Sequence, residues 1–374
     1  MSAAESPQEW ARRADEAARS VTRTFGKRLF FLPGTHIGAS VRPQNRFRAL
    51  LKPWNYWWQA HYVDCLVDTG RRELASGVKF DGADRPSAGR LASRLVTTVR
   101  LRNFLRFVNN YYDDMAWLAL ATLRLEDLAE QSRKTGRGAG RLRNAKVRES
   151  LTLQFDSAST EDLGGGTFWN VARDFKNTPA TAPVALYYAR TGRPERAQGL
   201  LDWLNARLFD PERGLYLDGL RIRGAETVLV ADIYSYNQGP VLGAMLELGG
   251  GENLSRAADL VAAVSRQLTL DGGMVVRCHG DGDGGLFTGI LLRYLALAAA
   301  DERLPENACR QARQMVLETA EALWTGRTET APGTLTFSRD PRRRAAEMFP
   351  PGAAVELSTQ LQAWMALEAA ARLG

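Results

Sequence analysis

The sequence contains little cysteine. Cys65, Cys278 and Cys309 are its three cysteines in 374 residues, and no two of them form a C-x-x-C pair. This spacing indicates neither a disulfide framework nor a structural zinc site. It is typical of a protein that works in a reducing compartment.

Histidine is equally scarce. The three histidines, His36, His61 and His279, are widely separated, and none has a second histidine four residues away. Metal catalysis therefore lacks support, and we expect no metal or other cofactor. The chain also has no G-x-S-x-G element, so a Ser-His-Asp hydrolase is not indicated.

No long apolar run is present. The most apolar late segment, residues 289–300, is short and is interrupted by Arg293, whereas a membrane-spanning helix needs about 20 apolar residues. The opening MSAAESPQEWARR is polar and acidic, unlike a signal peptide, which begins with basic residues and continues with about 7–15 apolar ones. We therefore expect a soluble, cytoplasmic protein with no membrane insertion.

Neither sign of charge dominates strongly. The chain has 49 Lys and Arg against 42 Asp and Glu, a formal charge of +7, which favours contact with polyanions only weakly. Residues 133–148 contain seven of the basic residues and no aromatic one. This pattern predicts a solvated loop, or alternatively a contact with anionic lipid headgroups, and it lacks the stacking residues of nucleic-acid recognition. We expect no nucleic-acid partner.

The composition, with 45% hydrophobic and 24% charged residues, is that of a globular chain. Apolar residues recur at helical spacing between Gly and Pro boundaries in twelve segments. The predicted helices cover residues 8–24, 53–69, 87–107, 113–131, 142–155, 177–190, 194–208, 237–248, 253–268, 287–300, 305–324 and 355–372. Alternating residues at 273–277 and 334–337 predict small hairpins in loops.

Twelve helices without a Ser- or Pro-rich linker predict an all-α fold. We expect six antiparallel helical hairpins that close into a double-layered (α/α)6 barrel. Residues 1–374 would then form a single domain, with residues 1–45 as an N-terminal helix and loop that pack on the barrel.

Unusual polar and aromatic residues gather at the starts of the even-numbered predicted helices. They are Trp57 at the second, Asp113 and Asp114 at the fourth, Lys176 and Asn177 at the sixth, Tyr236, Asn237 and Gln238 at the eighth, and Phe287 at the tenth. In an alternating toroid these helices run parallel, so their starts open on one end and can line one concave site.

Asp113 and Asp114 are adjacent carboxylates at a helix start. Ordinary helix capping is an alternative, because Asp is favoured at the N-cap and in the first turn, but capping needs only one of them. Two carboxylates this close resist joint ionisation, so the pKa of one should rise while the other stays charged. Such a pair suits retaining glycoside hydrolysis, in which the two carboxyl groups lie about 5–5.5 Å apart.

The segment NNYYDDMAWLALA at residues 109–121 resembles the paired-aspartate signature of the glycoside hydrolase family 76 α-1,6-mannanases. The similarity continues in YWWQAHYVDCLVD at 56–68, in Trp169-Asn170 with Lys176-Asn177, in YNQG at 236–239, and in FTGI at 287–290 followed by Arg293-Tyr294. The chain departs from the family at Thr288, where a basic residue is common.

The resemblance implies an (α/α)6 barrel and a retaining, metal-independent cleavage of α-1,6-linked mannosides in mannan or mannooligosaccharides. It assigns Asp113 as the nucleophile and Asp114 as the acid/base. The residues themselves indicate a pair without ordering the two roles, since both lie in the same helical turn.

Substrate contacts are expected around the pair. Aromatic rings there would stack on sugar faces or pack in the core, and Asn237 and Gln238 would bond hydroxyls or cap a helix. Asp283 lies in a turn that could reach the site. The candidate substrate-binding residues are Trp57, Tyr112, Trp169, Asn170, Lys176, Asn177, Tyr236, Asn237, Gln238, Asp283 and Phe287.

Two alternatives stay open. A sugar 2-epimerase on the same barrel would need histidines near the cleft, and only His61 lies near the predicted helix starts. A noncatalytic protein could instead hold mannan or a lipoglycan in the same groove.

Overall fold

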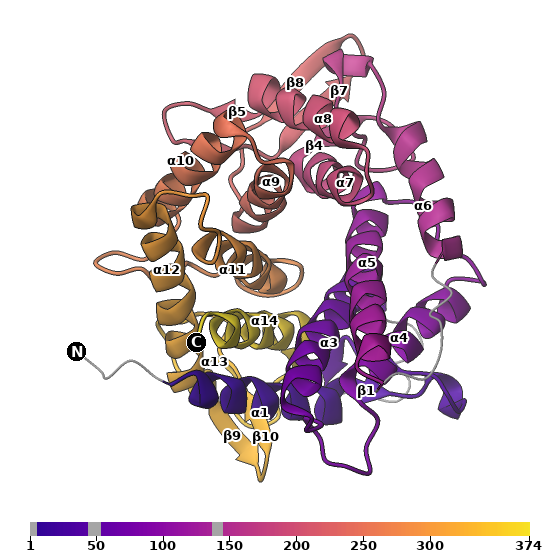
Figure 1. Ribbon diagram of the computed structural model, residues 1–374, viewed down its shortest axis with the longest axis vertical. Helices are drawn as coiled ribbons and strands as arrows, with labels where there is room; N and C mark the ends of the chain where they lie inside the picture. The colour runs from indigo at the N-terminus through magenta and orange to yellow at the C-terminus, as the bar shows by residue number, and fades with distance from the viewer. Residues whose placement is uncertain (1–5, 44–53, 137–144) are drawn as a thin grey trace.

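The computed structural model describes residues 6–43, 54–136 and 145–374. Six of its helices form an inner ring. They are α3 (Tyr56–Ser76), α5 (Tyr112–Lys134), α7 (Thr178–Arg190), α9 (Ser235–Leu248), α11 (Gly284–Ala299) and α14 (Leu357–Leu373). Each packs against the next, and α14 packs against α3, so the ring is closed (Figure 1).

Six further helices form an outer layer around this ring (Figure 1). They are α1 (Pro7–Phe25), α4 (Ala88–Arg102), α6 (Ala145–Ala158), α8 (Pro194–Arg207), α10 (Gly251–Gln267) and α12 (Glu306–Thr325). Each lies against an inner helix, and one-turn α13 (Ala345–Met348) lies in a loop. The mainly helical fold is therefore confirmed, and each of the twelve predicted ranges overlaps a helix.

Burial separates the two layers. In α7, every residue from Thr178 to Tyr188 is buried, and α9 and α11 are buried almost as completely. Outer helices such as α1, α4 and α10 instead bury one face and expose charged residues on the other, which is the pattern of helices that cover a core. Inner helices also approach closely, since a Cβ atom at Gly239 or Gly243 would lie 2.7 or 2.6 Å from the ring of Tyr294.

The predicted third helix is too long. Helix α4 ends at Arg102, because Phe104 and Leu105 adopt positive φ angles of 53° and 63° that an α-helix does not allow. The last predicted helix begins two residues early, since Val355 and Glu356 form strand β11.

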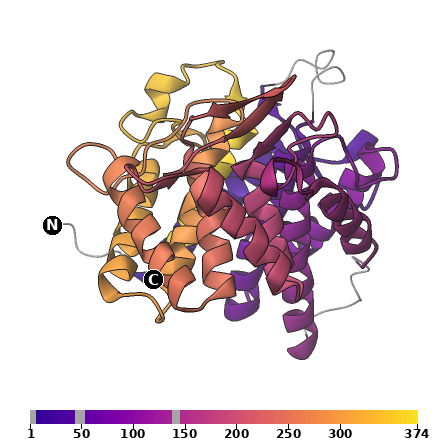
Figure 2. The ribbon, with the colours of Figure 1, turned by 90° about the horizontal axis from the view of Figure 1, so that it is seen from above.

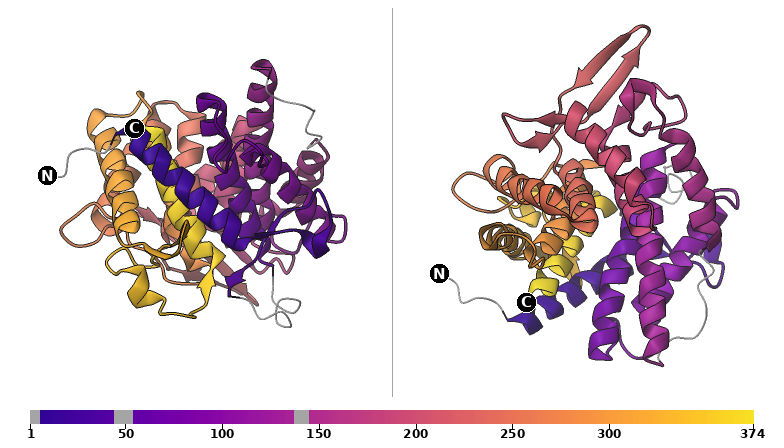
Figure 3. Two further views of the ribbon diagram at one scale, coloured as in Figure 1. Left: turned by 90° about the horizontal axis from the view of Figure 1, so that it is seen from below. Right: turned by 45° about the horizontal axis from the view of Figure 1, so that its top comes forward.

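Short strands occupy the loops at one end of the ring. The three-stranded sheet has the order β4 (Phe175–Asn177), β7 (Gly219–Arg223), β8 (Glu226–Val230), and its β7–β8 hairpin projects beyond the helices (Figures 2 and 3). Two-stranded pairs join β1 (Gly26–Lys27) to β2 (Ile37–Gly38), β3 (Val41–Arg42) to β11 (Val355–Glu356), β5 (Phe209–Asp210) to β6 (Leu215–Tyr216), and β9 (Thr328–Ala331) to β10 (Thr334–Thr336).

The hairpin predicted at 334–337 is confirmed by β9 and β10, whereas 273–277 contributes only a bridge between Val276 and Thr269. The β7–β8 hairpin was not predicted from the sequence, although Leu220 and Ile222 alternate there with arginines.

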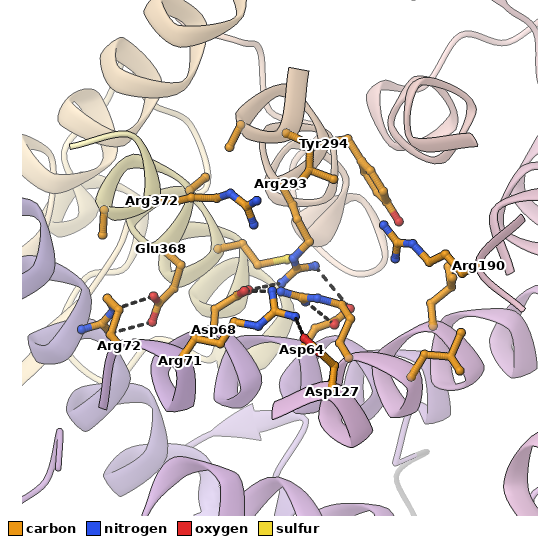
Figure 4. Close-up of a pocket in the computed structure, with 18 of the residues that line it drawn as sticks. Asp64, Asp68, Arg71, Arg72, Asp127, Arg190, Arg293, Tyr294, Glu368 and Arg372 are labelled. Atoms are coloured by element: carbon orange, nitrogen blue, oxygen red, sulfur yellow. Dashed lines mark hydrogen bonds and ion pairs between the residues drawn. The ribbon is translucent and has the colours of Figure 1, made fainter. Parts of the chain in front are cut away.

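A cavity of about 660 Å³ lies among the second halves of the inner helices, away from their starts. Figure 4 shows its charged lining. Arg124 of α5 pairs with both Asp64 and Asp68 of α3, and Arg293 of α11 reaches the same two carboxylates at 3.4 and 3.3 Å. Burial alone would raise the pKa of Asp64, but the two guanidiniums outweigh it and hold that pKa below its usual range.

This arrangement predicts that Arg124→Met destabilises the fold. Removal of one partner from a buried ion pair leaves an uncompensated charge and costs about 3–5 kcal/mol. Arg190→Met is the matched control, because Arg190 lines the same cavity but pairs at 3.1 Å with the largely exposed Glu247, and such pairs contribute about 0–1 kcal/mol. Urea unfolding measures both variants, and equal losses would contradict a structural role for the buried network.

Candidate active site

The first turn of α5 places Asp113 and Asp114 at the start of an inner helix. Asp113 accepts two hydrogen bonds: Oδ2 from the indole N–H of Trp169 and Oδ1 from the backbone N–H of Asp114, both at 2.9 Å. Asp114 accepts one, from the side-chain amide of Asn109 at 2.7 Å. Both carboxyl groups are half-buried. They can therefore be reached from solvent, although fewer water molecules surround them than at the surface.

The electrostatics of the pair differ from those of the cavity carboxylates. Burial raises the pKa of Asp113 to about 7, against the opposing effect of its two hydrogen bonds, and the charge of Asp283 adds to the rise. Burial and the adjacent charge of Asp113 raise the pKa of Asp114 well above its usual range. Two N–H donors favour an anion at Asp113, whereas Asp114 has one, so Asp114 is the better holder of a proton.

The start of α11 meets the start of α3 at Asp283. Its Oδ1 accepts the indole N–H groups of Trp57 at 2.9 Å and Trp58 at 2.8 Å. Asp283 is exposed and Trp57 is half-buried. The structure thus brings Trp57 and Asp283 together, and it adds Trp58, which was not among the candidate substrate-binding residues.

Aromatic rings from α9 and α11 continue this surface. Tyr236 and Phe287 stack with centroids 4.0 Å apart, and Trp57 lies 6.2 Å from Tyr236. Tyr234 and His279 also contact Phe287. Burial raises the pKa of Tyr236, and the charges of Asp218, Asp113 and Asp283 raise it further, so this ring lies within electrostatic reach of all three acids.

Asp218 is a fourth carboxyl group of this region that the sequence analysis missed. It accepts a hydrogen bond from the side-chain amide of Asn237 at 3.3 Å, and its own burial raises its pKa to about 6. Its backbone carbonyl accepts the N–H of Thr178, so it also joins the starts of α7 and α9. The signal in the sequence was a lone acid in the apolar stretch GLYLDGL at 214–220.

Several candidate substrate contacts are instead used by the scaffold. Lys176 is fully buried, and its ammonium donates to the backbone carbonyls of residues 160, 162, 165 and 166. Gln238 is fully buried and bonds the backbone of Tyr216 in both directions. Asn177 is buried and accepts the N–H of Ala180 as the N-cap of α7.

Three other candidates lie nearer the pair. Tyr112 is buried, and its backbone N–H donates to the carbonyl of Trp169 at 2.8 Å. Asn170 forms a bridge with Tyr111 and remains half-buried. Asn237 is buried below the surface, where it holds Asp218. The burial of Tyr112 and Asn237 favours positioning roles over direct contact with a ligand.

His61, the histidine near the predicted helix starts, is not presented to the site, whereas His279 lies against Phe287 at its edge. His61 is 1% exposed and lies between Trp57 and Trp117, and burial lowers its pKa to about 3. A buried imidazole with so low a pKa has no proton to donate at neutral pH and is shielded from a substrate, so His61 does not suit the general-acid role of an epimerase. Among the described residues, no three His, Cys, Asp or Glu side chains converge as metal ligands, and no helix is long and apolar enough to cross a membrane.

Comparison with known proteins gives one family. The family model described as glycosyl hydrolase family 76 matches residues 9–371. A comparison with curated protein sequences gave no match.

Among solved structures, the chain is similar to the GH76A α-1,6-mannanase of Salegentibacter sp. HEL1_6, with a TM-score of 0.80 and 27% identity over 98% of this chain and 100% of that one. An inactive variant of that enzyme, with two successive aspartates replaced by asparagine, is in complex with α-1,6-mannotriose; it gives a TM-score of 0.80 and 26% identity, with 98% and 100% coverage. The chain is also similar to the Lin0763 protein of Listeria innocua, with a TM-score of 0.76 and 25% identity over 97% of each chain.

The raised pKa of Asp114 predicts that Asp114→Asn stabilises the fold in a pH-dependent way. Above the ordinary carboxyl range near pH 4, the unfolded chain has lost a proton that the folded chain retains, so the free energy of unfolding falls as pH rises. Asparagine has no such proton. We expect the variant to melt roughly 2–4 °C above the wild type at pH 8 and close to it at pH 4. An equal difference at both pH values would contradict the raised pKa.

Proposed function

Because this chain belongs to glycosyl hydrolase family 76, we propose that it is a retaining glycoside hydrolase that cleaves α-1,6-mannosidic linkages in mannan or mannooligosaccharides. The observation that carries this proposal is the half-buried pair Asp113 and Asp114 at the start of an inner helix, with carboxyl pKa values raised. In this account the two helical layers are an (α/α)6 barrel that forms a single domain.

Asp113 is the nucleophile in this mechanism. Its two N–H donors stabilise the anion, which attacks the anomeric carbon and forms a mannosyl ester as the glycosidic C–O bond breaks. Asp114 gives its proton to the leaving oxygen. It then removes a proton from the water that hydrolyses the ester, and the free Asp113 carboxylate is restored.

Retention follows from the spacing of the pair. Adjacent side chains in one helical turn suit the separation of about 5–5.5 Å that a retaining pair needs, rather than the roughly 6.5–9.5 Å that leaves room for a water. The two solved complexes of the Salegentibacter enzyme with α-1,6-mannotriose and α-1,6-mannotetrose support mannooligosaccharides as the substrate class.

The surface around the pair would hold the sugar. Trp57, Trp169, Tyr236 and Phe287 offer half-buried rings, and sugar C–H faces stack on such rings. Asp283, Asn170 and Asp218 can accept hydrogen bonds from hydroxyls. Lys176, Asn177 and Gln238 are not proposed as contacts, because neighbouring backbone groups occupy their polar atoms.

We expect Asp113→Asn and Asp114→Asn each to lower kcat on α-1,6-mannotriose by roughly 10³-fold or more, while titration calorimetry still detects binding. Asp259→Asn is the matched control, because Asp259 is exposed on outer helix α10. A 4-nitrophenyl α-1,6-mannobioside separates the two roles. Its leaving group needs no proton, so Asp114→Asn should release nitrophenolate in a burst and Asp113→Asn should not.

Wild-type turnover by Asp113→Asn would remove that residue from the mechanism. A wild-type protein that binds the oligosaccharides without cleaving them would instead be a noncatalytic mannan-binding protein.

A further inference from the structure

Two loops present large apolar side chains to solvent. Phe31 is 91% exposed and Phe104 is 87% exposed, and Phe30, Leu32 and Leu105 are also exposed. Phe30, Phe31, Phe104 and Leu105 all have positive φ angles, between 44° and 63°, a conformation that non-glycine residues rarely adopt. The chain therefore holds these side chains outward in both loops, in a backbone geometry that is itself unfavourable.

The two segments that carry these loops contact each other. The backbone N–H of His36 donates to the hydroxyl of Thr98 on α4 at 2.9 Å, and β2 packs against α4. Figure 1 shows β1 beside α4. Burial lowers the pKa of Lys27, and the nearby guanidiniums of Arg42 and Arg102 lower it further, which places cations of both segments close together.

The two segments that carry these side chains are basic, and Asp81, from the loop between them, pairs with Arg23. Residues 17–43 contain five Lys or Arg, residues 85–112 contain six, and neither segment contains an Asp or Glu. In the described part of the chain, none of the following cations forms an ion pair with a carboxylate: Lys27, Arg28, Arg94, Arg102 and Arg106. Uncompensated like charges around exposed apolar residues are unfavourable in water alone and indicate an absent, anionic partner.

We propose that this docking face, formed by the five exposed apolar residues and the five unpaired cations, binds the surface of an anionic lipid bilayer. The face combines apolar and cationic side chains, which match the two parts of a bilayer surface. Phenyl and leucyl side chains enter the boundary between headgroups and acyl chains, and the Lys and Arg side chains pair with anionic headgroups. The contact is peripheral and needs no membrane-spanning helix.

The docking face adjoins the mouth of the candidate active site. Residues 103–111 connect α4 to α5, and the hydroxyl of Tyr56, the first residue of α3, donates to the carbonyl of Phe107 at 2.7 Å. Leu105 lies four positions before Asn109, whose side chain donates a hydrogen bond to Asp114, and this chain distance is at most about 14 Å. Docking would therefore hold the active site near glycans that are attached to the bilayer.

Vesicle sedimentation tests the proposal without substrate, so its result is independent of catalysis. The vesicles are pure phosphatidylcholine, or equal parts of phosphatidylcholine and phosphatidylglycerol. We expect the wild type to sediment with the anionic vesicles only. The double variant Phe31→Ala/Phe104→Ala should bind at least about tenfold more weakly, because two apolar side chains no longer enter the bilayer.

Charge is tested by Arg28→Gln/Arg102→Gln, for which we expect a loss of roughly tenfold or more. Two controls match these variants. Leu153→Ala removes a side chain that is 63% exposed, like Leu105, on outer helix α6, and Arg207→Gln/Arg266→Gln makes the same charge change on α8 and α10. Both controls should bind as the wild type does.

Three results would overturn the proposal: no binding of the wild type to anionic vesicles, equal binding to both vesicle types, or unchanged binding of the Phe31→Ala/Phe104→Ala variant. The thermal melting curve of that variant, followed by circular dichroism, serves as its folding control. Both replaced phenyl groups are exposed, so folding should be retained.

Discussion

Closure of the inner ring is the constraint on which the other features depend. The six inner helices, of which α7 and α9 are buried on almost every face, pack against one another and against an outer layer, and the alternation of layers makes them begin at one end. That end collects side chains that are far apart in sequence. Asp283, which precedes α11, accepts hydrogen bonds from Trp57 and Trp58 of α3, and Asp218 joins the starts of α7 and α9.

The pKa values of aspartates shift in opposite directions at the two ends of the ring. Asp64 is buried between two guanidiniums, which lower its pKa and make it part of the framework. Asp113 and Asp114 are partly shielded from water with no cation beside them in the part of the chain that the structure describes, and burial raises their pKa values. One end of the ring is therefore stabilised by paired charges, whereas the other keeps acids whose protons can move. Under the proposed function, the stabilising ion pairs and the catalytic acids lie on opposite halves of the inner helices.

Helix positions were largely predictable, because apolar spacing and Gly or Pro boundaries are local signals. The end of α4 was predicted too late, because the strained backbone at Phe104 and Leu105 that ends the helix has no such local signal in the sequence. At the site, Asp113, Asp114 and Trp57 could be found as polar or aromatic residues at helix starts. Lys176 and Gln238 also lie at helix starts, but only the fold shows that their polar atoms form hydrogen bonds with backbone groups. Asp218 lies in a loop between helices, so its approach to Tyr236 depends on tertiary packing.

A covalent intermediate on Asp113, with Asp114 as the acid and base, is tested by proton NMR of the anomeric signals. The purified protein is mixed with α-1,6-mannooligosaccharides and followed from the earliest time points. A double displacement predicts that the α-anomer appears first and converts to the β-anomer by mutarotation. If the β-anomer appeared first, the reaction would invert, and a more distant carboxyl group such as Asp218 or Asp283 would have to act as the base.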